Sequence, residues 1–251
     1  MGEAVRGDGF AGTCAFFTAA ALALIAAFGI DSKVSSYAVD HAPVYGSAAR
    51  AQKASDVLQY VSAGAAAVIY AVKYFRPADE LFRYPYRMDV FSPLSHESAM
   101  PPVNAAMAFV FSGLTTSMTT ELLKDYTGRE RPNAADNLSF PSGHATAAAW
   151  ANHSSILMIR DMNLPLRYEI PAYTALSLLT LGTAWGRVEA AKHYPTDVLA
   201  GMLIGIALTD ASFALFQNGA NQRQADNTRF NIQFSNERIG ATTGLLMTVD
   251  F

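Results

Sequence analysis

Three short segments concentrate residues that could bind an anion and transfer protons. They are residues 124–132 (KDYTGRERP), 141–144 (PSGH) and 187–197 (RVEAAKHYPTD). Together they bring lysine, arginine, histidine and aspartate into a chain in which charged residues make up only 16%. Each segment lies at the edge of an apolar stretch long enough to form a helix. Cations and imidazoles at helix ends indicate a site that handles a phosphate-sized oxyanion.

The second segment, PSGH, predicts the start of a helix. Ser142 precedes the apolar run that begins at Ala145 and can act as its N-cap, and Gly143 allows close approach of the backbone. A helix start offers free N–H groups to an anion, and His144 in the first turn would face that anion. By itself the tetrapeptide is a weak signal and favours a capped helix that has no catalytic role.

The first segment predicts two anion-binding cations. Lys124 would lie at a helix C-terminus, and Arg131 follows seven residues later. Because only eight residues separate the end of this segment from Pro141, these cations must lie near the PSGH turn. Arg129 is interpreted as structural, since Glu130 beside it indicates a solvated charge cluster.

The third segment predicts a histidine–aspartate pair. Arg187 ends one apolar run, and Pro195 suits the first position of the next helix. His193 precedes that helix, and Asp197 follows four residues later on the same side. An aspartate that accepts from one imidazole nitrogen leaves the other free to attack a substrate. For this segment alone, a pair that only caps a helix remains an alternative.

Taken together, the segments read Lys-x6-Arg-Pro, then PSGH, then Arg-x5-His-x3-Asp. This order and spacing resemble the type 2 phosphatidic acid phosphatase (PAP2) superfamily, which includes lipid phosphatases, bacterial class A acid phosphatases and vanadium haloperoxidases. The resemblance covers about residues 102–217. It implies an all-α fold, a helical bundle of about six core helices.

The resemblance also implies a role for each residue. His193 would be the nucleophile that forms a phosphohistidine, held by Asp197, while His144 would be the general acid and later the base for water. Phosphoryl oxygens would be bound by Lys124, Arg131, Ser142, Gly143 and Arg187. No metal or other cofactor is implied, and vanadate should inhibit. The family usually has serine before the arginine of the third segment, where this chain has Gly186.

The expected function is therefore a metal-independent phosphatase acting on phosphomonoesters or pyrophosphates, with lipid phosphates among the candidate substrates. The alternatives are an integral-membrane isoprenyl or phosphatidyl phosphate phosphatase, a non-catalytic envelope binding or assembly protein, and a vanadate-dependent peroxidase. The expected location is the bacterial cell envelope, periplasmic or membrane-associated. A net charge of −3 gives no support for a nucleic-acid partner.

The composition leaves the relation to a membrane open. Hydrophobic residues make up 51% of the chain, and the uncharged runs 9–30 and 98–120 reach the length of a membrane span. Other apolar runs are shorter or interrupted by charge. Helices rich in Ala, Ser and Thr favour a mainly non-spanning bundle, with an integral membrane protein as the alternative. Residues 10–30 are interpreted as a first core helix rather than a signal or anchor.

Apolar runs and the residues between them predict helices at about 10–30, 33–41, 48–74, 102–123, 144–160, 168–186 and 195–217. Residues 75–101 and 124–143 are expected to be loops. Residues 1–217 should form one domain. Residues 218–251 should form a polar linker and then, from their alternating pattern, a β-hairpin that packs on the same domain.

Overall fold

The computed structural model describes residues 30–75, 100–162, 164–228, 231–239 and 242–250. These ranges contain six helical segments: 30–41, α2 (Ala48–Phe75), α4 (Pro102–Thr127), α5 (Gly143–Arg160), α6 (Leu166–Glu189) and α7 (Pro195–Thr228). The predicted all-α bundle is therefore confirmed. The predicted helix 10–30 and most of the predicted loop 75–101 lie outside the described residues.

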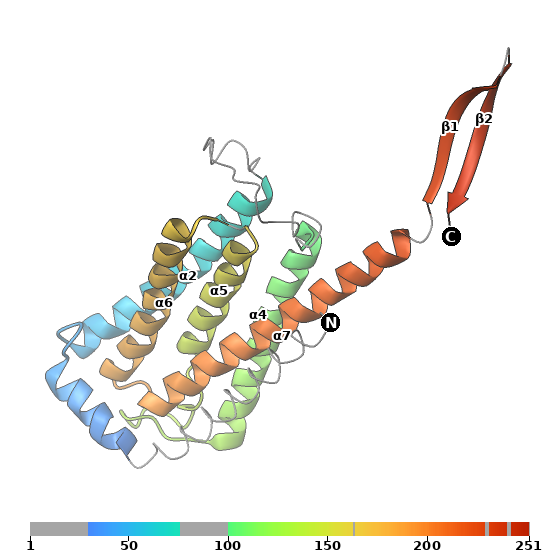
Figure 1. Cartoon of the computed structure of the whole chain (residues 1–251). Coiled ribbons are helices and arrows are strands. Elements are labelled where there is room, and N and C mark those ends of the chain that lie inside the picture. Colours follow the sequence, from blue (N-terminus) through green and yellow to red (C-terminus); the bar gives the residue numbers. More distant parts are fainter. Residues whose placement is uncertain (1–29, 76–99, 163, 229–230, 240–241, 251) are drawn as a thin grey trace, which may run out of the picture.

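Helix α5 lies at the centre of the bundle (Figure 1), where it contacts α2, α4, α6 and α7. Its buried side chains are mostly small or polar, such as Ala148, Asn152 and Ser155. Small side chains allow neighbouring helices to approach closely. The core of this protein is therefore built on close helix contacts rather than on large apolar side chains.

A Gly-x-x-x-Gly pair in α7 brings that helix against the backbone of α5. A Cβ atom at Gly201 would lie 2.6 Å from the Ser142 carbonyl oxygen, and one at Gly205 would lie 2.6 Å from the Thr146 carbonyl oxygen. Side chains at these two positions would collide with backbone that cannot move aside cheaply. Glycine at these positions thus lets α7 hold the start of α5, which carries the PSGH segment.

A second pair, Gly182 and Gly186, plays the same part between α6 and α2. A Cβ atom at Gly186 would lie 2.9 Å from both the Ala51 carbonyl oxygen and the Ser55 Cβ. Gly186 is the position at which the family usually has serine. In this chain, helix α2 occupies the space that the serine side chain would need.

Helix α4 is longer than predicted at its C-terminal end. Gly128 ends it in a left-handed conformation with φ 53°, and the Gly128 N–H donates to the Lys124 carbonyl oxygen. Lys124 therefore belongs to the last turn of α4 rather than to the loop that follows. The ammonium group is fixed to a regular element at the end of the bundle.

The predicted linker is wrong, because α7 continues to Thr228 and residues 218–227 are helical. This stretch is polar, but it contains no proline, and its residue types permit a helix. Polarity alone therefore did not mark the end of the helix.

Two strands follow α7, β1 (Asn231–Ile239) and β2 (Thr242–Asp250). They pair antiparallel, with the first residue of β1 opposite the last of β2. Figure 1 shows the pair beyond the end of α7, and its packing on the domain stays a prediction.

Candidate active site

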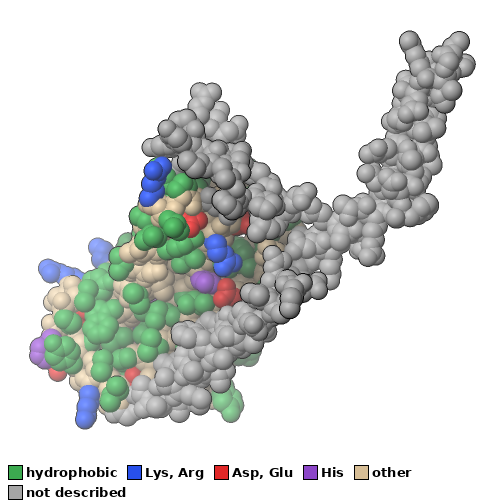
Figure 2. All heavy atoms as spheres, viewed as in Figure 1, with side chains coloured by type: hydrophobic (Ala, Val, Ile, Leu, Met, Phe, Trp, Pro, Cys, Tyr) green, Lys and Arg blue, Asp and Glu red, His purple; other side chains and the backbone are tan. Residues whose placement is uncertain are grey.

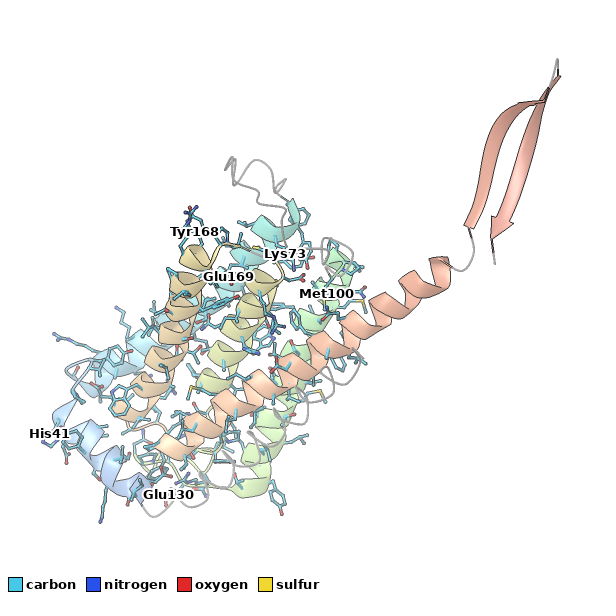
Figure 3. All side chains as sticks on the ribbon, in the orientation of Figure 1. His41, Lys73, Met100, Glu130, Tyr168 and Glu169 are labelled. Carbon is cyan, nitrogen blue, oxygen red and sulfur yellow. The ribbon has the colours of Figure 1, made fainter. Side chains whose placement is uncertain are left out.

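The three chemically active segments meet at one end of the bundle. Helices α4 and α6 end there, and α5 and α7 begin there, so the segments that connect or cap them lie side by side. Figure 3 shows Glu130, from the first segment, at the end of the bundle opposite Lys73 and Glu169. The fold itself therefore gathers residues that are far apart in the sequence.

Direct contacts join the segments to one another. A Cβ atom at Gly143 would lie 3.4 Å from Lys124 Nζ, so the first segment adjoins the second. The Ser142 N–H donates to the Asp197 carbonyl oxygen at 3.0 Å. Arg131 Nη1 donates to a backbone carbonyl of the third segment at 3.4 Å. The three segments form one cluster.

Ser142 is the N-cap of α5, as predicted. It is fully buried with an extended backbone, and its hydroxyl oxygen accepts from the Ala145 N–H at 3.5 Å. The start of α5 accordingly presents its partial positive charge to the cluster. Binding of phosphate by the Ser142 hydroxyl and by Gly143 stays a prediction.

Each predicted phosphate-binding cation is paired with a carboxylate. The pairs are Lys124 with Glu121 (2.6 Å), Arg131 with Asp136 (2.6 Å) and Arg187 with Asp56 (3.2 Å). The carboxylates of Glu121 and Asp136 are 66% and 43% exposed, so water screens these pairs and a phosphate can replace them at small cost. Arg187 Nε is buried without a hydrogen-bond partner and remains available as a donor.

His193 is buried and held by a backbone carbonyl. Its Nδ1 lies 2.6 Å from the Ser139 carbonyl oxygen, and because a carbonyl can only accept, Nδ1 carries the proton. Burial lowers the pKa of His193 to about 3, with Arg187 and Arg131 acting in the same direction and the Ser139 hydrogen bond opposing it. The ring is therefore neutral near pH 7, with the lone pair on Nε2.

Asp197 does not make the expected hydrogen bond to His193. Its Oδ2 lies 3.8 Å from Nδ1 of the imidazole, beyond hydrogen-bonding distance. Its oxygens accept instead from the Ser139 hydroxyl (2.5 Å), the Tyr194 N–H (2.8 Å) and Arg129 Nη1 (2.5 Å). Asp197 thereby fixes the residue whose carbonyl orients the imidazole.

The interpretation of Arg129 as part of a solvated charge cluster is wrong. Its side chain is only 20% exposed, and it bridges Asp197 and Asp31, the latter at 2.8 Å. Asp31 belongs to the helical segment 30–41 and also accepts from the Thr196 N–H at the start of α7, at 3.0 Å. The residues Arg129 and Asp31 are 98 positions apart, so no local signal could have revealed the contact.

Asp56 of α2 is a second residue that the sequence motifs did not identify. Its Oδ1 lies 2.9 Å from His144 Nε2 and 3.2 Å from Arg187 Nη1. Partial burial lowers the pKa of His144, as does the charge of Arg187, while Asp56 acts in the opposite direction. The predicted acid therefore titrates under the influence of a carboxylate from outside the three segments.

Comparison with known proteins supports the resemblance to the PAP2 superfamily. The model of the PAP2 superfamily matches residues 105–220. Decaprenylphosphoryl-5-phosphoribose phosphatase from Mycobacterium tuberculosis, in strains CDC 1551 / Oshkosh and H37Rv, is 34% identical over 93 residues, which is 34% of this chain and 46% of the relative. The chain thus spans about half the length of the curated relatives it matches.

Among solved structures, the fold is similar to that of the transmembrane PAP2 type phosphatidylglycerolphosphate phosphatase from Bacillus subtilis. The TM-score is 0.53 at 20% sequence identity, over 84% of this chain and 96% of that one. The segment matched by the family model contains all the residues predicted for the site. The similarity to the PAP2 superfamily thus rests on residues 105–220, somewhat less than half of the chain.

Proposed function

We propose that the chain is a phosphatase that removes phosphate from a lipid through a phosphohistidine on His193, without a metal ion. The observation that carries this proposal is the meeting of three cations and two imidazoles in one cluster: Lys124, Arg131, Arg187, His144 and His193. Phosphoryl transfer needs mainly positioning and stabilisation of charge, and three cations can supply both.

In the first step, the lone pair on Nε2 of His193 attacks phosphorus and the bond to the leaving oxygen breaks. His144 gives its proton to that oxygen, so the product leaves as an alcohol or a phosphate. Lys124 and Arg131 exchange their carboxylate partners for non-bridging oxygens of the phosphoryl group, and Arg187 donates to one of these oxygens from its unpaired Nε.

In the second step, water attacks the phosphohistidine. His144, now neutral, takes a proton from that water while the P–N bond breaks and the electron pair returns to Nε2 of His193. Inorganic phosphate leaves, and both imidazoles are back in their starting states. The cycle uses only groups that this chain supplies.

The surface of α4 supports a lipid substrate. Its buried face is small or polar, with Ala105, Ala108, Ser112, Thr116 and Thr120, whereas large apolar side chains are exposed along the other face. The exposed residues are Val103, Met107, Val110, Leu114, Met118 and Leu122, each more than half exposed. A helix with its large apolar residues outside and its polar residues inside is suited to lipid rather than water.

Two further features support a bundle embedded in a membrane. The helices Ala48–Phe75 and Pro195–Gln217 are long and apolar enough to cross a bilayer, by length and composition. Figure 2 shows hydrophobic side chains over much of the described surface on the side of α2 and α6. These features favour the membrane alternative over the non-spanning bundle that the sequence composition favoured. The site, at the helix ends, would then meet lipid headgroups at the boundary with water.

Hydrolysis assays on the purified full chain in detergent test this proposal. Wild type should release phosphate from p-nitrophenyl phosphate and from an isoprenyl phosphate in excess EDTA, and vanadate should inhibit, since its trigonal-bipyramidal form resembles the transition state. His193→Ala should abolish turnover, while His41→Ala, at an exposed histidine outside the cluster, should retain it. Full activity of His193→Ala, or no activity of wild type on either substrate, would refute the proposal.

A further inference from the structure

We propose that Asp56 is the positioning residue of the general acid, and that its carboxylate holds His144 in the orientation and charge state needed to protonate the leaving group. This inference rests on the proposed phosphatase activity. Asp56 lies on α2, outside the residues 105–220 that match the family model. It therefore adds a functional residue from a part of the chain that carries no recognised motif.

The first support is geometric. A single oxygen, Asp56 Oδ1, contacts both His144 Nε2 at 2.9 Å and Arg187 Nη1 at 3.2 Å. This oxygen therefore links the proposed acid, His144, to the cation Arg187. Helix α2 is placed by its own packing on α6, where Gly186 allows the backbones to meet. The position of Asp56 is thus set independently of the loops that carry the other site residues.

The second support is electrostatic. Among the described residues, the other charged groups that influence the pKa of His144 are cations, Lys124 from α4 and Arg187 from α6, and the neighbouring ring of His193, before α7, is neutral. Cations and burial both favour loss of the His144 proton, whereas Asp56 favours its retention through charge and through the hydrogen bond. A general acid must hold its proton when the leaving oxygen departs. Asp56 therefore stabilises the protonated form of His144, which burial and the two cations disfavour.

The same contact has a competing explanation. Asp56 could occupy the place of a phosphate oxygen, as Glu121 and Asp136 do on the other two cations. Removal of an occupying carboxylate would help substrate to bind, whereas removal of a positioning carboxylate would slow proton transfer. The two explanations therefore predict opposite changes in activity.

The test compares wild type with Asp56→Asn on two substrates in detergent. p-Nitrophenolate leaves readily without a proton, but an alkyl phosphate monoester depends on the acid. We expect kcat/KM for the alkyl phosphate to fall by about 100-fold and for p-nitrophenyl phosphate by less than about threefold. The alkaline limb of kcat/KM should move to lower pH by about one unit. Glu121→Gln, which removes the same charge beside Lys124, should change both substrates alike and leave the limb in place.

A second pair of variants separates positioning from general structural support. Added formate should restore alkyl phosphate hydrolysis to Asp56→Ala, because the side chain is 40% exposed and a small carboxylate can reach its place. In a His144→Ala background, Asp56→Asn should cause no further loss on the alkyl phosphate.

The inference would be overturned if Asp56→Asn lost activity equally on both substrates and the alkaline limb of its pH profile did not move. A rise in kcat/KM in Asp56→Asn, or an additional loss in the His144→Ala background, would also overturn it. An inactive wild type would instead refute the proposed function. The two failures are therefore distinguishable.

Discussion

The carbonyl oxygen of Ser139 lies 2.6 Å from Nδ1 of His193, closer than any oxygen of Asp197. The tautomer of the proposed nucleophile is accordingly fixed by backbone, which cannot change its protonation state. Asp197 influences His193 only indirectly. Its carboxylate accepts from the Ser139 hydroxyl at 2.5 Å and so holds the residue whose carbonyl orients the imidazole. The histidine–aspartate pair that the third segment suggests thus works through a residue that lies outside all three segments.

This arrangement predicts a neutral His193 with its proton on Nδ1. Since burial lowers the pKa of His193 to about 3, its imidazole should not titrate between about pH 5 and pH 8. Nitrogen-15 spectra of histidine-labelled protein, with the signal assigned by its loss in His193→Gln, check this directly. A signal that converts to the imidazolium pattern near pH 6.5 would contradict it.

The same pKa predicts how stability depends on pH. Histidine in the unfolded chain titrates near pH 6.5 and folded His193 near pH 3, so the unfolded state binds more protons between these values. Stability should therefore fall as the pH is lowered through this window. The unfolding temperature should drop less steeply in His193→Gln than in wild type, and identical slopes would contradict the prediction.

Arg129 should be important for both stability and activity. Arg129→Gln leaves the buried carboxylates of Asp31 and Asp197 without their shared counter-ion, which should cost about 3–5 kcal/mol. A lower unfolding temperature and a lower kcat are expected. Arg50→Gln, at an exposed arginine, is the matched control and should change neither. Wild-type stability in Arg129→Gln would show that the bridge is not needed.

Gly186→Ser restores the residue that the family usually has, yet it should reduce activity in this chain. The new side chain would meet the Ala51 carbonyl oxygen and Ser55 at 2.9 Å and push α2 away from α6. Because α2 carries Asp56, hydrolysis of alkyl phosphates should suffer most. The control is Gly64→Ser, at a glycine of α2 with open space around it, and it should leave kcat/KM unchanged. An increase in kcat/KM would indicate that the serine hydroxyl matters more than helix packing.

Some of this site could be predicted from sequence because its signals are local. The N-cap at Ser142 follows from one residue and the apolar run behind it, and the order of the three segments points to a common cluster. Contacts between distant elements have no such signal. Asp56 is a lone acid on an otherwise ordinary helix, and Asp31 meets Arg129 only after the chain folds.

The glycine pairs are a sequence signal for close helix contacts that lies outside the charged motifs. Gly182 with Gly186, and Gly201 with Gly205, have the spacing of close helix contacts, and they mark where α6 meets α2 and α7 meets α5. The exposed apolar face of α4 shows the opposite case. From the sequence, its large apolar residues could be assigned either to the core or to a lipid-facing surface. Only the fold shows which side of the helix is buried.

The central claim is that His193 carries the phosphoryl group, and trapping that intermediate tests it most directly. Wild type should be mixed with phosphate-labelled substrate, quenched in alkali within one turnover, digested and analysed by mass spectrometry. We predict phosphate on the peptide that contains His193, and no phosphopeptide from His193→Ala. Phosphate on a different residue, or a label that persists in His193→Ala, would contradict the account.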